Sequence, residues 1–161
     1  MQSKQCLKRF GSTPRTMIHT KILIGQHDAA MAIAQRLLFL IDSHRGSEDA
    51  FAIALQLAKL FGLLRMHLAH EDTELYPSLA TSANPEVAEL ARAYMMEMGS
   101  LAESFEQFAL RWSSSAVIAT SFEQFRTGAF DLIAALEVRI ERKVYLYPMA
   151  ALVAPKKKRA A

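Results

Sequence analysis

The chain has 161 residues, of which 52% are hydrophobic, and its formal net charge is +3 at pH 7. This length fits one domain, and the apolar content is sufficient for a compact core. All 16 acidic residues lie between residues 22 and 155, whereas both ends of the chain are basic, which argues against a nucleic-acid-binding surface on the folded body.

Glycine and proline are scarce, and apolar residues recur at steps of three and four, which together favour an all-α fold. The first apolar stripe includes Ile24, and its helix is expected to end between Asp42 and Gly46. A second helix is predicted after Ser47, a residue suited to the N-cap position, and it approaches its end at Pro77.

The third helix is predicted to start at Asn84-Pro85-Glu86, because these residues suit the cap, the first helical position and the first turn. A fourth helix is predicted over residues 117–149. Short connections imply antiparallel neighbours, so the predicted architecture is an up-down-up-down antiparallel four-helix bundle. We assign residues 1–17 to a basic N-terminal arm, residues 18–150 to the bundle and residues 151–161 to a basic flexible tail.

Two imidazoles and three carboxylates lie within two helical turns at the end of the second predicted helix. Residues at i and i+4 share a helix face, so His67 and Glu71 can point at a common centre. The apolar stripe of this helix selects that pair for the interior, and His27 has an equivalent inward position on the first helix. Leu75-Tyr76-Pro77 follows the motif, and the same tripeptide recurs at Leu146-Tyr147-Pro148.

An apolar helix that carries His27, followed by His67-x-x-x-Glu71 and Leu75-Tyr76-Pro77, resembles the hemerythrin-like (HHE cation-binding) domain. The likeness covers roughly residues 18–150. It implies four helices around a non-haem di-iron centre bridged by carboxylates, in proteins that bind oxygen, respond to oxygen or nitric oxide, or handle iron. Carried over by motif, His27, His67 and Glu71 match the ligands of the first two helices.

The second half of the chain departs from this family pattern, because all five histidines precede Glu71. The carboxylate nearest to a ligand position is Glu97 on the third helix, and Glu141 is a candidate on the fourth. Two cations, Arg139 and Lys143, stand where the fourth helix of the family offers a histidine and a carboxylate.

Three interpretations of the centre remain open. In the first, one ion of iron, manganese or zinc is held by the two imidazoles, Glu71 and a carboxylate such as Glu97 or Glu141. In the second, Arg139 or Lys143 neutralises Glu71 where a metal would otherwise sit. In the third, the two cations extend to the surface, and Glu97 and Glu141 complete a two-metal centre.

Other function classes find little support in the sequence. Every long apolar segment is interrupted by charge, as Arg36 and Asp42 interrupt the first one, so no segment is expected to cross a membrane. The single cysteine, Cys6, cannot form an intramolecular disulfide, and the N-terminus lacks a signal-peptide pattern, so we expect a soluble cytoplasmic protein. We expect no enzyme, because hydrolase and nucleotide-binding motifs are missing.

The sequence therefore predicts a metal-binding protein with an altered or reduced centre that acts in oxygen, nitric oxide or iron sensing, or in a stress response. The expected cofactor is iron, in preference to manganese or zinc. The centre could hold one iron ion, two iron ions or none. The candidate partners are oxygen, nitric oxide, another protein and a second copy of the chain. The alternative is a metal-free helical interaction bundle in which Arg139 or Lys143 replaces the metal charge. The candidate ligands are His27, His67, Glu71, Glu97 and Glu141.

Overall fold

The structure, a computed structural model, describes residues 15–143 and 146–152, and within these ranges every regular element is helical. The predicted all-α class is thereby confirmed. The predicted arm and tail lie mostly outside the described residues, although α1 already begins at Arg15. The elements in chain order are α1 (Arg15–Asp42), α2 (Ser47–His70), η1 (Glu71–Leu75), α3 (Tyr76–Ala80), α4 (Pro85–Arg111), α5 (Ser115–Thr120), α6 (Phe122–Lys143) and α7 (Leu146–Leu152).

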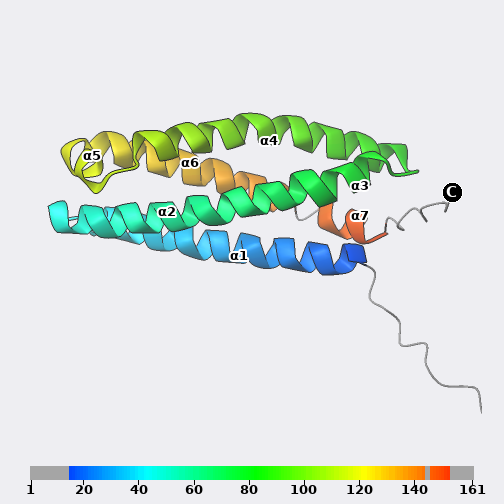
Figure 1. The fold of residues 1–161 in the computed structure, drawn as a ribbon, viewed down its shortest axis with the longest axis horizontal. Coiled ribbons are helices and arrows are strands. Elements are labelled where there is room, and N and C mark those ends of the chain that lie inside the picture. Colours follow the sequence, from blue (N-terminus) through cyan, green and yellow to red (C-terminus); the bar gives the residue numbers. More distant parts are fainter. Residues whose placement is uncertain (1–14, 144–145, 153–161) are drawn as a thin grey trace, which may run out of the picture.

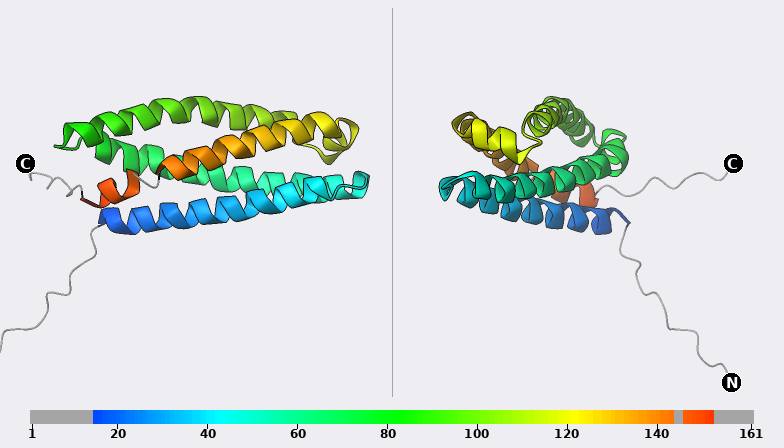
Figure 2. Two further views of the ribbon diagram at one scale, coloured as in Figure 1. Left: turned by 180° about the vertical axis from the view of Figure 1, so that it is seen from behind. Right: turned by 60° about the vertical axis from the view of Figure 1, so that its left-hand side comes forward.

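The long helices lie along the longest axis of the molecule (Figure 1). Two further views show α1 beside α2, and α4 beside α6 (Figure 2). The short helix α5 closes one end, and α7 lies at the opposite end against the beginning of α1. The elements are more numerous than the four helices predicted, because the second and fourth predicted helices are each divided.

Local sequence signals account for several helix ends. Helix α4 begins at Pro85 as predicted, and the Asn84 side chain accepts a hydrogen bond of 2.9 Å from the backbone N–H of Glu86. The predicted helix over residues 117–149 is wrong at its start, because the chain turns at Ser121 between α5 and α6. The Thr120 hydroxyl donates to the backbone carbonyl of Ala116 at 3.0 Å, which satisfies an acceptor where α5 ends.

A short π-helical segment, η1, follows α2 without a break and leads directly into α3. The wider π turn brings residues five apart onto one face, whereas an α-helix aligns residues four apart. Glu71 at the start of η1 and Tyr76 at the start of α3 are accordingly both fully buried on the same side. Single π turns occur frequently at functional sites.

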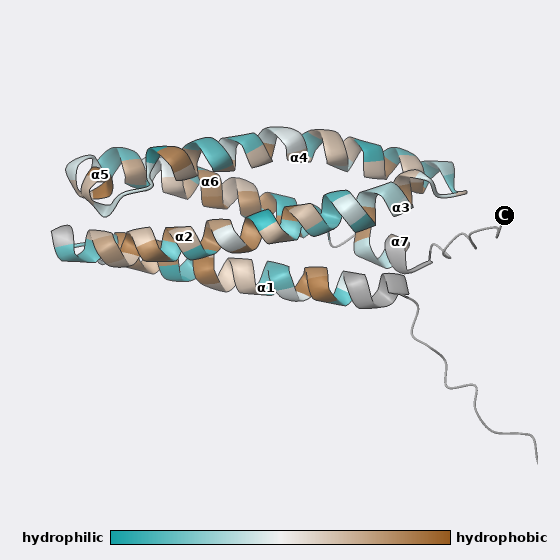
Figure 3. Cartoon of the chain, viewed as in Figure 1, coloured by the Kyte–Doolittle hydropathy of each residue, from teal (hydrophilic) through white to brown (hydrophobic). Residues whose placement is uncertain are grey.

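The interior consists of two hydrophobic clusters with polar groups between them. On α1, His27 lies between Leu23 of one cluster and Ala30 of the other. On α6 and α7, Lys143 lies in the same way between Leu136 and Leu146. Figure 3 shows hydrophilic and hydrophobic residues alternating along the helices, with the most hydrophobic stretches on α1 and α2. The polar groups therefore sit in the core itself.

One helical stretch, Glu48–Ala80, is long and apolar enough by composition to cross a membrane. Lys59 and Arg65 interrupt this stretch, and the expectation that no segment crosses a membrane stays a prediction. Only 33% of its most apolar window is buried in the structure, and core helices of soluble proteins pass the same test. A single such helix is weak evidence for a membrane span.

Candidate metal centre

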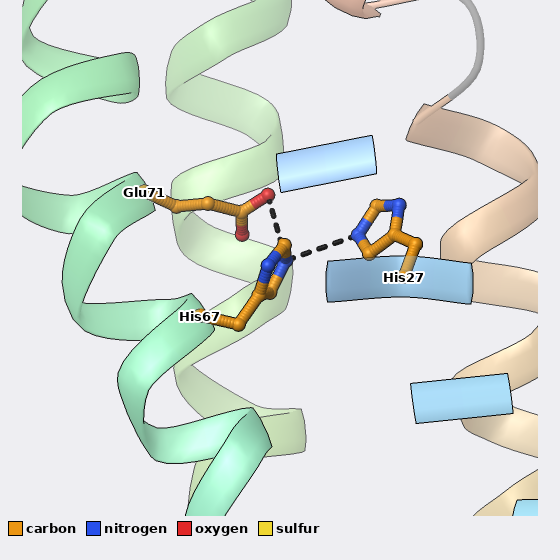
Figure 4. Close-up of side chains that lie close together, drawn as sticks. All are labelled: His27, His67 and Glu71. Atoms are coloured by element: carbon orange, nitrogen blue, oxygen red, sulfur yellow. Dashed lines mark hydrogen bonds and ion pairs between the residues drawn. The ribbon is translucent and has the colours of Figure 1, made fainter. Parts of the chain in front are cut away.

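Polar side chains from separate elements meet between the two hydrophobic clusters. His27 comes from α1 and His67 from α2, and their rings face each other beside Glu71 of η1 (Figure 4). All three side chains are buried, and one ligand atom from each lies within 4.8 Å of the others. Lys143 of α6 and Tyr147 of α7 approach the same carboxylate. The structure thus brings together three of the five predicted ligands.

Glu71 is the hub of this cluster and has no exposed surface. Its Oε1 accepts a hydrogen bond of 2.9 Å from the Tyr147 hydroxyl and lies 3.2 Å from His67 Nε2. Its Oε2 accepts hydrogen bonds from the Lys143 ammonium and, at 3.3 Å, from the Tyr76 hydroxyl. The two oxygens therefore face different partners, an imidazole on one side and an ammonium on the other.

The surroundings of Glu71 keep it ionised. Burial alone would raise its pKa, but the hydrogen bond from His67, which forms when Nε2 carries a proton, and the charge of Lys143 outweigh burial and lower the pKa to about 2. Burial lowers the pKa of Lys143, and Glu71 opposes this shift. The pKa of Tyr147 is raised by burial and by the nearby Glu71 charge, so its phenol keeps a proton to donate in the metal-free protein.

The two imidazoles are in direct contact, with 3.0 Å between His27 Nε2 and His67 Nε2. Burial, followed by the neighbouring His67 and Lys143, lowers the pKa of His27 to about 3, so His27 is neutral at physiological pH. On its other side, His67 Nδ1 lies 3.0 Å from the side-chain oxygen of Gln26. Because an amide oxygen only accepts, this contact requires the hydrogen of His67 on Nδ1.

The position of that hydrogen leaves a lone pair on Nε2 of a neutral His67. This lone pair would face the Glu71 carboxylate oxygen at 3.2 Å and His27 Nε2 at 3.0 Å. A neutral His27 can donate its Nε2–H to this lone pair, but toward Glu71 the lone pair meets a carboxylate oxygen, and the two repel unless a positive centre lies between them. The cluster is therefore chemically suited to hold a cation.

The spacing of the donor atoms also suits a metal. Two ligands about 2.1 Å from one ion and at right angles to each other are about 3.0 Å apart. The separations of 3.0 Å between the imidazoles and 3.2 Å between His67 and Glu71 fall close to this value. Two histidines and one carboxylate form the donor set typical of mononuclear non-haem iron.

The other two predicted ligands are not part of the cluster. Glu97 on α4 is 49% exposed, and its Oε2 pairs with Arg139 at 2.6 Å and with Arg142 at 3.4 Å. Glu141 on α6 is exposed. Each of these carboxylates lies on a helix surface, and the structure therefore gives no support to a two-metal centre completed by them.

The two predicted cations have different roles. Arg139 does not contact Glu71; besides Glu97, its guanidinium donates to the Tyr94 carbonyl at 2.8 Å and to the Tyr76 hydroxyl at 3.4 Å. It also lies over the Tyr94 ring, 4.4 Å from the centroid. Lys143, which is 2% exposed, is the cation on Glu71. The interpretation in which both cations reach the surface is therefore wrong.

Sequence reasoning missed three members of the site: Gln26, Tyr76 and Tyr147. The signal for the tyrosines was the repeated Leu-Tyr-Pro, which contributed to the family resemblance but was not predicted to be part of the site. In the structure, each copy sends its tyrosine hydroxyl to one oxygen of Glu71. Gln26 immediately precedes His27, and only the packing of α1 against α2 shows that its amide reaches His67.

Replacement of Gln26 by leucine removes the oxygen that accepts the Nδ1–H of His67. Without this acceptor, the hydrogen of a neutral His67 is expected to move in part from Nδ1 to Nε2. Metal affinity should fall about 10- to 100-fold, as is usual when the group that orients a ligand histidine is removed. Nitrogen-15 NMR of the metal-free protein would report the tautomer directly. The Gln26→Glu variant, which keeps an acceptor oxygen, serves as the control; an unchanged tautomer in Gln26→Leu would contradict the assignment.

Comparison with known proteins identifies the family of this donor set. The family model described as hemerythrin HHE cation binding domain matches residues 19–150. These residues include His27, His67 and Glu71 on α1, α2 and η1, as well as Lys143 and Tyr147. No curated protein and no solved structure shows significant similarity to the chain.

Proposed function

Because the chain belongs to the hemerythrin HHE cation-binding family, we propose that it holds one iron ion at His27, His67 and Glu71, with Lys143 in place of a second metal. Iron bound to these three donors would offer further coordination positions to a small ligand. Manganese and zinc are the other metals that the donors suit. The protein acts in this proposal as a sensor or iron-handling protein, without catalytic turnover.

The proposal rests on the two carboxylate oxygens of Glu71, which have different partners. A carboxylate that bridges two metal ions offers one oxygen to each of them. In this chain Oε1 faces the imidazoles, but Oε2 is taken by the Lys143 ammonium. The lysine supplies a fixed positive charge at the second position, so only the first position is left for a metal ion.

The space around the centre also favours one ion. A void of about 10 Å³ lies beside the two imidazoles and Lys143, at the lower limit for one water molecule. Its other walls are mainly apolar side chains, with the Arg139 guanidinium as the further polar group. A second metal would therefore need to displace Lys143 from Glu71.

An apolar cavity supports a role in sensing small molecules. It has a volume of about 410 Å³ and reaches His27 of α1 and Tyr147 of α7 from the side of exposed Asp28. Small neutral molecules such as oxygen and nitric oxide dissolve readily in apolar surroundings, so the cavity offers them a route to the centre. A cytoplasmic location completes the proposal, because the single cysteine cannot form an internal disulfide.

The four-helix architecture of the family belongs to the same proposal. Each of the four helices corresponds here to one rod, by which we mean one element or several successive elements that run in the same direction. One rod is α1, and the second consists of α2 with η1 and α3, which continue it without a break. Helix α4 is the third rod, and α6 followed by α7 is the fourth. In this grouping neighbouring rods alternate in direction, and each of the rods α1, α2–α3 and α6–α7 contributes to the centre.

Metal analysis of protein expressed in iron-replete medium without a histidine tag tests the proposal. We expect one iron per chain in the wild-type protein. This iron should be lost in His67→Ala, because only two of the three donors, His27 and Glu71, then remain. Glu97→Gln is the matched control and should keep its iron, since that carboxylate lies with Arg139 and Arg142. Two irons per chain, or iron that survives in His67→Ala, would contradict a mononuclear site.

A metal-free interaction bundle is the second candidate, and the Lys143–Glu71 pair favours it. This pair already neutralises the buried carboxylate, so the core can be stable without any ion. The same metal analysis separates the two functions. A wild-type protein that remains free of metal under iron-replete expression would support the interaction bundle.

A further inference from the structure

We propose that the phenol oxygen of Tyr147 is a fourth metal donor, so that the centre is a His-His-Glu-Tyr site that binds ferric iron as a phenolate complex. This inference rests on the proposed function, because it adds a ligand to the same metal. The added ligand is a phenol, whereas the other three ligands are two histidines and a carboxylate.

The position of the Tyr147 hydroxyl is the geometric basis. Its oxygen lies 3.1 Å from His27 Nε2 and 2.9 Å from Glu71 Oε1. These separations match the 3.0 Å between the imidazoles and the 3.2 Å between His67 and Glu71. The phenol oxygen is thus spaced from its neighbours in the same way as the other three donors, and the side chain is only 4% exposed.

Tyr76 provides an internal comparison, because it occupies the same position in the other Leu-Tyr-Pro motif. Its hydroxyl donates at 3.3 Å to Glu71 Oε2, the oxygen that also holds Lys143. The Arg139 guanidinium donates to the same hydroxyl at 3.4 Å. Tyr76 therefore faces two cationic side chains, whereas Tyr147 faces the imidazole side of the carboxylate, and only Tyr147 is placed to bind a metal there.

The charge of the site supplies the chemical reason. The Lys143 ammonium cancels the charge of Glu71, and an imidazole binds a metal in its neutral form. Because Lys143 offsets the charge of Glu71, the three positive charges of ferric iron would then have no net compensation in a buried site, which is costly. When the iron–oxygen bond forms, the phenol O–H bond breaks and its proton passes to solvent, which leaves one phenolate charge on the metal.

Visible absorption spectroscopy of the full chain tests the inference. Metal-free protein is titrated with ferric nitrilotriacetate, and a phenolate-to-iron charge-transfer band should appear and saturate at one iron per chain. In Tyr147→Phe the band should be lost while iron still binds, with affinity lower by about tenfold or more. Tyr76→Phe is the matched control and should keep the band.

A second measurement avoids dependence on the variants. Resonance Raman spectra of wild-type ferric protein, grown with ring-deuterated tyrosine, should show phenolate modes that shift with the label, even if Tyr147→Phe fails to fold. A band that persists in Tyr147→Phe, or that disappears only in Tyr76→Phe, overturns the inference. Stoichiometric iron without phenolate modes overturns it but leaves the proposed function intact, whereas absence of iron binding overturns both.

Discussion

Replacement of Lys143 by methionine is expected to lower the free energy of unfolding of the metal-free protein by about 3 to 5 kcal/mol. Methionine is of similar length and apolar, but it leaves the carboxylate of Glu71 charged and fully buried without its ammonium partner. The hydroxyls of Tyr76 and Tyr147 remain as donors but carry no charge. For a chain of this size the melting temperature should fall by about 6 to 20 °C.

Urea denaturation at neutral pH would measure this loss, with Lys59→Met as the matched control. Lys59 lies on the exposed face of α2, so its replacement should change stability by no more than about 0.5 kcal/mol. Adding Glu71→Gln to Lys143→Met should recover part of the loss, because a neutral amide needs no counter-charge. Equal stability of Lys143→Met and Lys59→Met would show that Lys143 is not the counter-ion of Glu71.

The helices themselves were largely predictable from local sequence. The end of α1 at Asp42 and the start of α4 at Pro85 follow from cap residues and apolar spacing, which act within a few neighbouring residues. The break at Ser121 was not predicted, because apolar spacing continues across it. The π-helical turn at η1 depends on packing and leaves no clear signal in the apolar pattern.

The centre was predictable only where a single helix determines it. Periodicity indicated that His67 and Glu71 share an inward face, and the structure brings them together with His27. The choice between Arg139 and Lys143 depended on distances between helices, which one helix pattern does not contain. Glu97 was suggested by its proximity to the inward stripe, but its position is determined by two arginines on another helix.

Metal-free protein is also expected to lose stability as the pH falls below about 6.5, because His27 must remain neutral in the folded state. Burial, His67 and Lys143 lower the pKa of His27 from 6.5 to about 3. Between these values the unfolded chain binds a proton at His27 that the folded protein does not, so acid favours unfolding. Each pH unit costs about 1.4 kcal/mol, which gives about 3 kcal/mol between neutral pH and pH of about 4.5.

Glu71 does not account for a loss in this window. Its pKa is lowered from 4.5 to about 2, so its stabilising contribution is complete above 4.5 and disappears only as the pH falls toward 2. Burial lowers the pKa of Lys143 from its usual value of 10.5, and the neighbouring Glu71 opposes this shift. Of His27 and Glu71, His27 is therefore the group that loses stabilisation in the mildly acidic range.

Denaturant unfolding of metal-free wild-type protein and of His27→Phe, each at neutral pH and at pH of about 4.5, would isolate the contribution of His27. Phenylalanine keeps an aromatic ring in the core but cannot bind a proton, so the acid-dependent loss should shrink by about 3 kcal/mol in the variant. NMR of the wild-type imidazole gives an independent measurement and should show His27 neutral down to a pH near 3. An equal acid-dependent loss in both proteins would mean that other groups cause it, and a His27 resonance that titrates near 6.5 would mean that this ring is not held neutral by the core.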